Sequence, residues 1–153
     1  MKRILSTIFI FFFAVCMAQN KEVEKIIPPL EVIKQFEKAF PKIEPHWDKT
    51  YRGEDLTELN YDANFAIGGK NMTAVYTVFG VFKVLECELS QDEIPSNIRQ
   101  YLSKNYPENK IVRSLKIMNN NNKVTYEIGI KINDRLSDAL FDAQGDFLSI
   151  VEK

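Results

Sequence analysis

Two kinds of side chain in this sequence, histidine and cysteine, could act as a nucleophile, a base or a metal ligand. The chain has one histidine, His46, and two cysteines, Cys16 and Cys87. A structural zinc site takes about four ligands, more than these residues supply. A Cys87–His46 dyad would need the two side chains in hydrogen-bonding reach, and nothing in the sequence brings them together. Motifs of serine hydrolases, phosphate-binding loops and zinc proteases do not occur. We therefore predict no enzyme activity, no metal and no cofactor.

The first eighteen residues have the order of a secretory signal peptide. Lys2 and Arg3 precede an apolar run at 4–15, and Cys16-Met17-Ala18 provides small residues for cleavage after Ala18. We predict a periplasmic or secreted protein with no membrane span after signal removal. One alternative is a retained anchor, although the apolar run is shorter than the about 20 residues of a spanning helix. The other is a lipoprotein modified at Cys16, although Val15 stands where that pattern prefers Gly or Ala.

The charge balance argues against nucleic-acid binding, and the cysteine count excludes an internal disulfide in the mature chain. Lys and Arg number 20 and Asp and Glu number 21, so the chain has no basic footprint for nucleic acid. After signal removal Cys87 is the one cysteine left, so no internal disulfide can form. We expect Cys87 to be a buried, inert thiol, because free cysteine packs as a small hydrophobe. Intermolecular pairing of this thiol is the alternative.

Similar residues recur along the chain at an almost constant offset. Residues 29, 32, 36, 40 and 41 match residues 95, 98, 102, 106 and 107, and further matches continue to residue 147. In each set, apolar residues at helical spacing follow one proline and precede another, which predicts a helix that ends before the second proline. The predicted fold class is α+β, with two tandem copies of a helix followed by three or four antiparallel strands and the helices on one face of the sheet. The predicted boundaries are a signal peptide at 1–18, a linker at 19–27, and copies at 28–90 and 91–153.

The clearest strand pattern lies at 124–132, where apolar and polar residues alternate. We expect Ile128 and Ile130 to be buried in this strand, with Glu127 and Lys131 on the solvent face. The same pattern predicts that Tyr61 and Phe65 are buried in an earlier strand. Residues 142–146 read as a tight turn and lack the alternating oxygen ligands of a calcium loop.

A set of residues along the mature chain carries a family resemblance. It comprises Pro29, Val32, Phe36, Phe40, Pro41, Trp47, Tyr61-x-Ala63-x-Phe65, Gly69, Ala74, Tyr76, Gly80, Ile94-Pro95-x-x-Ile98 and Phe141-Asp142-x-x-Gly145. The pattern resembles the PepSY-like family of exported bacterial proteins, a relative of the β-lactamase-inhibitor-protein (BLIP) architecture. The resemblance spans residues 28–152 and implies an exported tandem module, usually without assigned activity. The inhibitor relative binds an enzyme through the exposed face of its sheet and its loops. The lack of disulfides departs from that relative, and no inhibitory motif is found here.

Four residues are candidates for contact with a partner. Val78 and Phe79 stand at a predicted hairpin tip, where apolar side chains are exposed unless another part of the fold covers them. Trp47 and Tyr51 are of types enriched at binding hot spots. For Phe79 the alternative is that it folds back onto the protein, and for Trp47 that it belongs to the core.

We therefore predict an exported, non-enzymatic binding module. It would contact an envelope or extracellular protein through its sheet face and loops, as an interaction or inhibitor-like domain. The alternative is a small-ligand carrier with a pocket between helix and sheet, which aromatic lining with few polar groups would favour. A weaker alternative is an enzyme with an unrecognised site.

Overall fold

The structure of this protein is a computed structural model that describes residues 25–53 and 55–153. The predicted signal peptide at 1–18, the candidate lipidation site Cys16 and most of the predicted linker at 19–27 lie outside the described residues. In the part of the chain that is described, no helix is long and apolar enough to cross a membrane.

The described chain contains two α-helices, one short 3₁₀ helix and eight strands. In chain order they are α1 (Leu30–Ala39), β1 (His46–Arg52), β2 (Glu58–Ile67), β3 (Lys70–Thr77), β4 (Phe82–Glu88), η1 (Gln91–Glu93), α2 (Ser96–Asn105), β5 (Lys110–Asn119), β6 (Val124–Ile132), β7 (Arg135–Asp142) and β8 (Phe147–Glu152).

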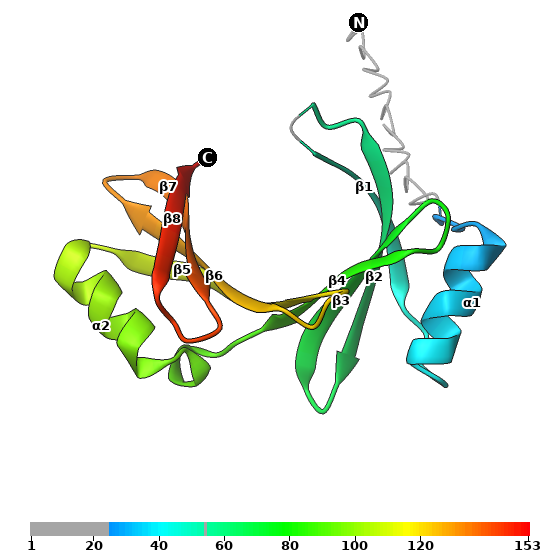
Figure 1. The fold of residues 1–153 in the computed structure, drawn as a ribbon, viewed down its shortest axis with the longest axis horizontal. Coiled ribbons are helices and arrows are strands. Elements are labelled where there is room, and N and C mark those ends of the chain that lie inside the picture. Colours follow the sequence, from blue (N-terminus) through cyan, green and yellow to red (C-terminus); the bar gives the residue numbers. More distant parts are fainter. Residues whose placement is uncertain (1–24, 54) are drawn as a thin grey trace, which may run out of the picture.

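All eight strands form one sheet in the order β1 to β8, with every neighbouring pair antiparallel (Figure 1). The prediction of an α+β fold made of two tandem helix-plus-strand copies is therefore wrong. The molecule is one continuous, mostly β structure with two helices. The finding that overturns the prediction is the β4–β5 pair, which runs from Val84–Asn119 to Glu88–Leu115. Alternation along a strand shows which face each residue occupies, but it does not show which strand lies alongside.

The local patterns that define the elements are confirmed. Both helices have a proline at the N-cap, Pro29 and Pro95, where a missing N–H leaves no helical bond unmade. The predicted strand at 124–132 is β6, and Ile128 and Ile130 are fully buried in it. Tyr61 and Phe65 of β2 are also buried.

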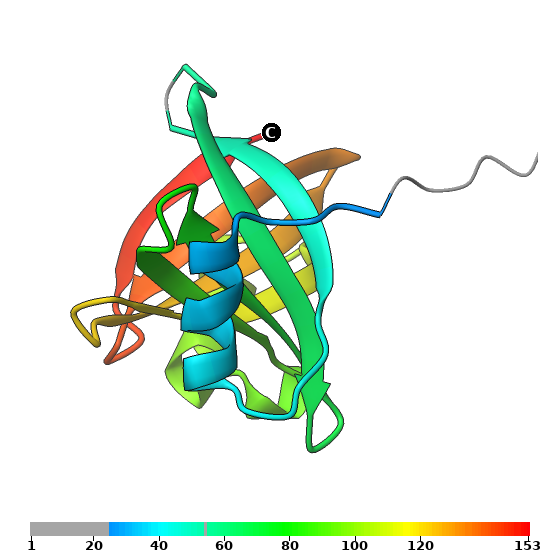
Figure 2. The same cartoon turned by 90° about the vertical axis from the view of Figure 1, so that its right-hand side faces the viewer.

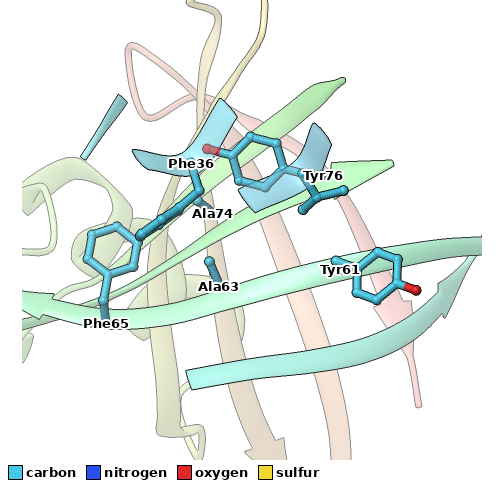
Figure 3. Close-up of a cluster of buried hydrophobic side chains, with 7 residues drawn as sticks. Phe36, Tyr61, Ala63, Phe65, Ala74 and Tyr76 are labelled. Carbon is cyan, nitrogen blue, oxygen red and sulfur yellow. The ribbon is translucent and has the colours of Figure 1, made fainter. Parts of the chain in front are cut away.

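The core consists of two apolar clusters, one under each helix. In the first cluster, Val32 and Phe36 of α1 pack on β2 and β3. Figure 3 shows Phe36, Phe65 and Tyr76 gathered around the small side chains of Ala63 and Ala74. In the second cluster, three residues before and within α2 pack on four residues of β6 and β7: Ile94, Ile98 and Leu102 on Ile128, Ile130, Ala139 and Phe141.

Both helices cover the same face of the sheet. Directly paired residues share a face in an antiparallel sheet. One row of such pairs joins the two clusters through Phe65, Met72, Cys87, Lys116, Tyr126 and Phe141. The sheet bends like an arch with the helices on its convex side (Figures 1 and 2). Neither of the two described helices lies on the concave side.

Candidate binding surfaces

Trp47 and Tyr51 lie on the helix-covered face of β1, at one edge of the sheet. Trp47 is half-buried, and its ring meets Phe36 edge to face at 5.4 Å between centroids. It therefore packs against the first core cluster. Tyr51, four residues along the same strand, is 59% exposed. The two residues are on one strand face but differ in exposure, so only Tyr51 presents most of its surface to solvent.

Val78 and Phe79 lie in the β3–β4 turn and also differ from each other. Val78 is half-buried against the first core cluster, whereas Phe79 is 79% exposed. The turn is closed by backbone bonds from Thr77 N–H to the Val81 carbonyl (2.9 Å) and from Gly80 N–H to the Thr77 carbonyl (3.0 Å). Phe79 thus does not fold back onto the protein.

His46 and Cys87 do not meet. His46 is exposed on the concave face of β1, with its Nε2 3.5 Å from Asp48 Oδ1. Cys87 belongs to the opposite face of β4, where it is half-buried and not fully buried as expected. A dyad between them is excluded by this geometry. No group of three or more His, Cys, Asp or Glu side chains within residues 25–53 and 55–153 is arranged to hold a metal ion.

Polar side chains fill the concave face and bond to one another across several strands. On the β1 side, Arg52 donates to Asp62 of β2 at 2.9 Å and to Glu86 of β4 at 3.1 Å. A second chain of bonds runs from Thr73 Oγ1 to Asn64 (2.7 Å) and from Asn64 to Asp48 (2.8 Å). Arg52 can reach a strand three places away because side chains on the inside of a curved sheet converge.

A similar network covers the β8 side of the same face. Arg113 of β5 donates to Glu127 of β6, and it lies 3.7 Å from Asp138 of β7. Lys153, just beyond β8, pairs with the same Asp138 at 2.6 Å. These bonds join charged groups of three successive strands and Lys153 just beyond β8, and each bond restricts the side chains that make it.

Burial and neighbouring charges together shift the pKa values of Glu127 and Arg52. Burial raises the pKa of Glu127, and neighbouring Asp138 and Glu86 raise it further, although Arg113 opposes the shift. For Arg52, burial lowers the pKa, but the hydrogen bonds and charges of Asp62 and Glu86 outweigh burial and raise it overall.

Apolar residues form the floor between the two networks. Val75 of β3 and Leu115 of β5 are buried on the concave face, and Val84 and Ile117 are half-buried beside them. A shallow hollow of about 130 Å³ opens here, lined by Asn71, Thr73, Glu86, Glu88, Arg113 and Leu115. An apolar centre with a polar rim is the usual composition of a protein-binding surface.

Sequence reasoning missed the residues of this face. Arg52, Asp62, Glu86, Glu127 and Asp138 were not among the predicted site residues. A signal for them does exist in the alternation, because charged residues recur on the solvent-facing positions of the predicted strands. Only the curvature of the sheet shows that they come together.

Solved structures of other proteins have a similar fold. No family model and no curated protein matches the chain. Among solved structures, a protein of Bacteroides eggerthii described as periplasmic has a TM-score of 0.70 at 14% identity, with 83% of this chain and 90% of that chain covered. A DUF2874 family protein of Bacteroides uniformis has a TM-score of 0.71 at 12% identity, with 82% of this chain and 90% of that chain covered. A BLIP-like protein of Bacteroides fragilis has a TM-score of 0.65 at 13% identity, with 83% of this chain and 87% of that chain covered.

Likeness at this level of identity establishes the fold and nothing more specific. The chain is similar to BLIP-like and DUF2874 family structures, which fits the BLIP part of the resemblance in the sequence. The tandem PepSY-like organisation is not confirmed by these comparisons.

Proposed function

We propose that this protein is a periplasmic, non-enzymatic binding module that contacts a partner protein through the concave face of its sheet. The observation that carries the proposal is this face, which neither described helix covers, with an apolar floor at Val75 and Leu115 between two networks of fixed charges. Preorganised charge favours specific recognition of a complementary surface. The BLIP-like character of a structural neighbour supports an inhibitor-like role, and the periplasmic description of another supports the location.

The exposed aromatic residues add to this surface only at its margins. Tyr51 is exposed on the helix-bearing face of β1, and Phe79 is exposed at the β3–β4 turn. We propose that they form contacts beside the concave face, together with half-buried Trp47 and Val78. The concave face supplies the larger area and the fixed charges.

Site-specific photocrosslinking tests which face the partner contacts. Adjacent residues of β5 point to opposite faces, so Ile117 on the concave side and Lys116 on the convex side form a matched pair. We expect p-benzoylphenylalanine at position 117 to give a crosslinked adduct in the periplasm and the same group at position 116 to give none. Adducts from position 116 alone, or equal adducts from both, would refute binding through the concave face.

Export itself is tested by the mass of the purified mature protein. Cleavage after Ala18 predicts a chain that begins at Gln19. A product that retains residues 1–18, or one acylated at Cys16, would contradict release into the periplasm as a free protein.

A further inference from the structure

A mostly apolar hollow lies on the convex face, where the sheet passes from α1 toward α2. It has a volume of about 430 Å³, and its main lining residues are Gln35, Phe40, Tyr76, Phe82, Leu85 and Met118. This volume is in the range of small-molecule sites, which combine apolar and aromatic walls with a few polar groups. The hollow is on the opposite side of the sheet from the proposed protein-binding face.

The β7–β8 pair of the same sheet has a matching arrangement of aromatic residues, and there a side chain of the protein occupies the equivalent space. Tyr76 of β3 pairs with Phe82 of β4 beyond a register shift, and Phe141 of β7 pairs with Phe147 of β8 beyond an equivalent shift. The two aromatic pairs also have similar geometry, with centroids 5.7 and 5.8 Å apart.

Beside the β7–β8 pair, the protein provides its own third ring. Tyr101 of α2 stacks on Phe147 at 4.7 Å with an interplanar angle of 14°, and it meets Phe141 edge to face at 5.6 Å. Beside the β3–β4 pair, the corresponding helix position holds Gln35. Each of these residues is the sixth of its helix and precedes a buried residue, Leu102 or Phe36. The exposed Gln35 has no ring to place on Phe82, and the space stays open.

The Tyr76 side chain lines this hollow, and its hydroxyl is a buried hydrogen-bond donor without a partner among the described residues. Tyr76 as a whole is 1% exposed. Leaving a buried hydroxyl unpaired is destabilising. Phe141 occupies the matching place on β7 without a hydroxyl, so packing alone does not require one.

We propose that this hollow binds a small aromatic carboxylate. The ring of the ligand lies on Phe82, as the ring of Tyr101 lies on Phe147. In the complex, the carboxylate reaches the Tyr76 hydroxyl, which solvent does not reach in the ligand-free protein, and accepts its hydrogen bond. Lys38 also lines the hollow, and its positive charge favours an anion over a neutral ligand. Gln35 is the movable wall, because it is exposed and its side-chain bond runs to Glu31 on its own helix at 3.0 Å.

The test is a titration of the purified mature protein with benzoate and with 1-naphthoate, followed by NMR of the protein amides and by calorimetry. We expect saturable binding, with shifts at α1, β3 and β4. Gln35→Tyr should abolish binding because it fills the hollow with the ring that Tyr101 provides elsewhere. Tyr76→Phe should weaken binding about tenfold or more, as expected for a lost hydrogen bond to a charged group.

Three controls make the assignment specific. Tyr76→Phe should raise the thermal unfolding midpoint of the ligand-free protein, because it removes an unpaired buried hydroxyl. Lys38→Gln should weaken benzoate binding, whereas Lys34→Gln, on the same helix but outside the hollow, should not.

No saturable binding at millimolar concentration, or binding that persists in folded Gln35→Tyr, would overturn the proposal. Benzyl alcohol that binds as tightly as benzoate would overturn the choice of an acid. None of these outcomes bears on crosslinking from the concave face.

Discussion

The side chains of the concave face act as a group because the sheet curvature brings them together. Glu127 shows this most clearly. Arg113 pairs with it, while Asp138 and Glu86 are close enough to disfavour its charge. The charges of Arg113 and Lys153 favour its ionised form, but burial and the two acidic neighbours outweigh them, so the charged carboxylate is held at a net cost.

The raised pKa of Glu127 gives a prediction for the pH dependence of stability. Between the ordinary carboxyl value and the raised folded value, the folded state binds more protons than the unfolded state. The free energy of unfolding therefore falls as pH rises through this window. Glu127→Gln has no such group to ionise. We expect the difference in unfolding free energy, variant minus wild type, to increase between pH 4 and pH 7 in urea titrations.

Glu58 provides a control of opposite sign. The hydrogen bond from Lys83 and the charge of that lysine lower the pKa of Glu58. Stability from this group is present above the unfolded pKa and is lost as pH falls through the folded value. Glu58→Gln should therefore lose stability relative to wild type as pH rises, by a small amount because the pair is exposed. If both variants drift in the same direction with pH, the environment described for Glu127 is wrong.

Individual residues of the candidate surfaces were predictable to different degrees. The sequence places Phe79 in a tight turn but leaves open whether its ring folds back onto the protein, and the structure shows that the ring is exposed. The sequence also predicts Glu127 on the solvent-facing side of its strand, and the register confirms the face. It does not predict that this face is concave and partly dehydrated, because bending of the sheet depends on packing under two helices. The hollow at Tyr76 depends on which residue of α1 lies above β3, which the sequence does not show.

At the scale of elements, two turns dock the sheet onto the starts of the helices. Gly80 in the β3–β4 turn has φ of +79°, and a Cβ there would lie 3.0 Å from the carbonyl oxygen of Glu31 in α1. Gly145 in the β7–β8 turn has φ of +81°, and the neighbouring Gln144 carbonyl accepts a 2.8 Å hydrogen bond from Asn97 of α2. Glycine is required at both places by backbone conformation and by the close approach of a helix.

Gly80→Ala should therefore be more destabilising than the same change in a free turn. Gly69 is the matched control, since it has φ of +80° and a Cβ added there would meet no described atom within 4 Å. We expect Gly69→Ala to cost about 1–2 kcal/mol from backbone strain alone. Gly80→Ala should cost clearly more in urea unfolding, because the Glu31 backbone must also shift. Equal losses would mean that the contact with α1 contributes nothing.

The elements themselves follow from local rules, but their assembly does not. Proline-bounded helices and the strand at 124–132 are determined by residues close in the sequence. The β4–β5 pair joins strands separated by η1 and α2, and no local pattern specifies it. The prediction of two helix-plus-strand copies failed at this point. The predicted boundary between residues 90 and 91 is not a boundary of the sheet, which is continuous from β4 to β5.

The whole molecule combines two core clusters with one hydrogen-bonded sheet. The two clusters have no buried residue in common, and each includes residues of only one helix, α1 in the first and α2 in the second. Between them, the β4–β5 ladder is supported by a 2.6 Å bond from Ser114 Oγ to the Leu89 carbonyl and a 2.9 Å bond from Leu89 N–H to the Ser114 carbonyl. If the half that contains α2 unfolded, β4 would become an unpaired edge strand that exposes Leu85. If the half that contains α1 unfolded, β5 would become an unpaired edge strand that exposes Met118. Units of about 60 residues are also marginally stable alone.

We therefore expect the two clusters to unfold together. The sole tryptophan, Trp47, reports on the first cluster, whereas Ile130 is a fully buried member of the second. Ile130→Ala should lower the free energy of unfolding by about 2–5 kcal/mol, as usual for truncation of a buried aliphatic residue. If the halves are coupled, the Trp47 fluorescence transition in urea should shift as far as the transition seen by far-ultraviolet circular dichroism. The contrary result is a Trp47 transition that stays at its wild-type midpoint while the circular dichroism signal splits into two transitions. That result would show that each cluster unfolds independently and that the β4–β5 ladder does not couple the stability of the two halves.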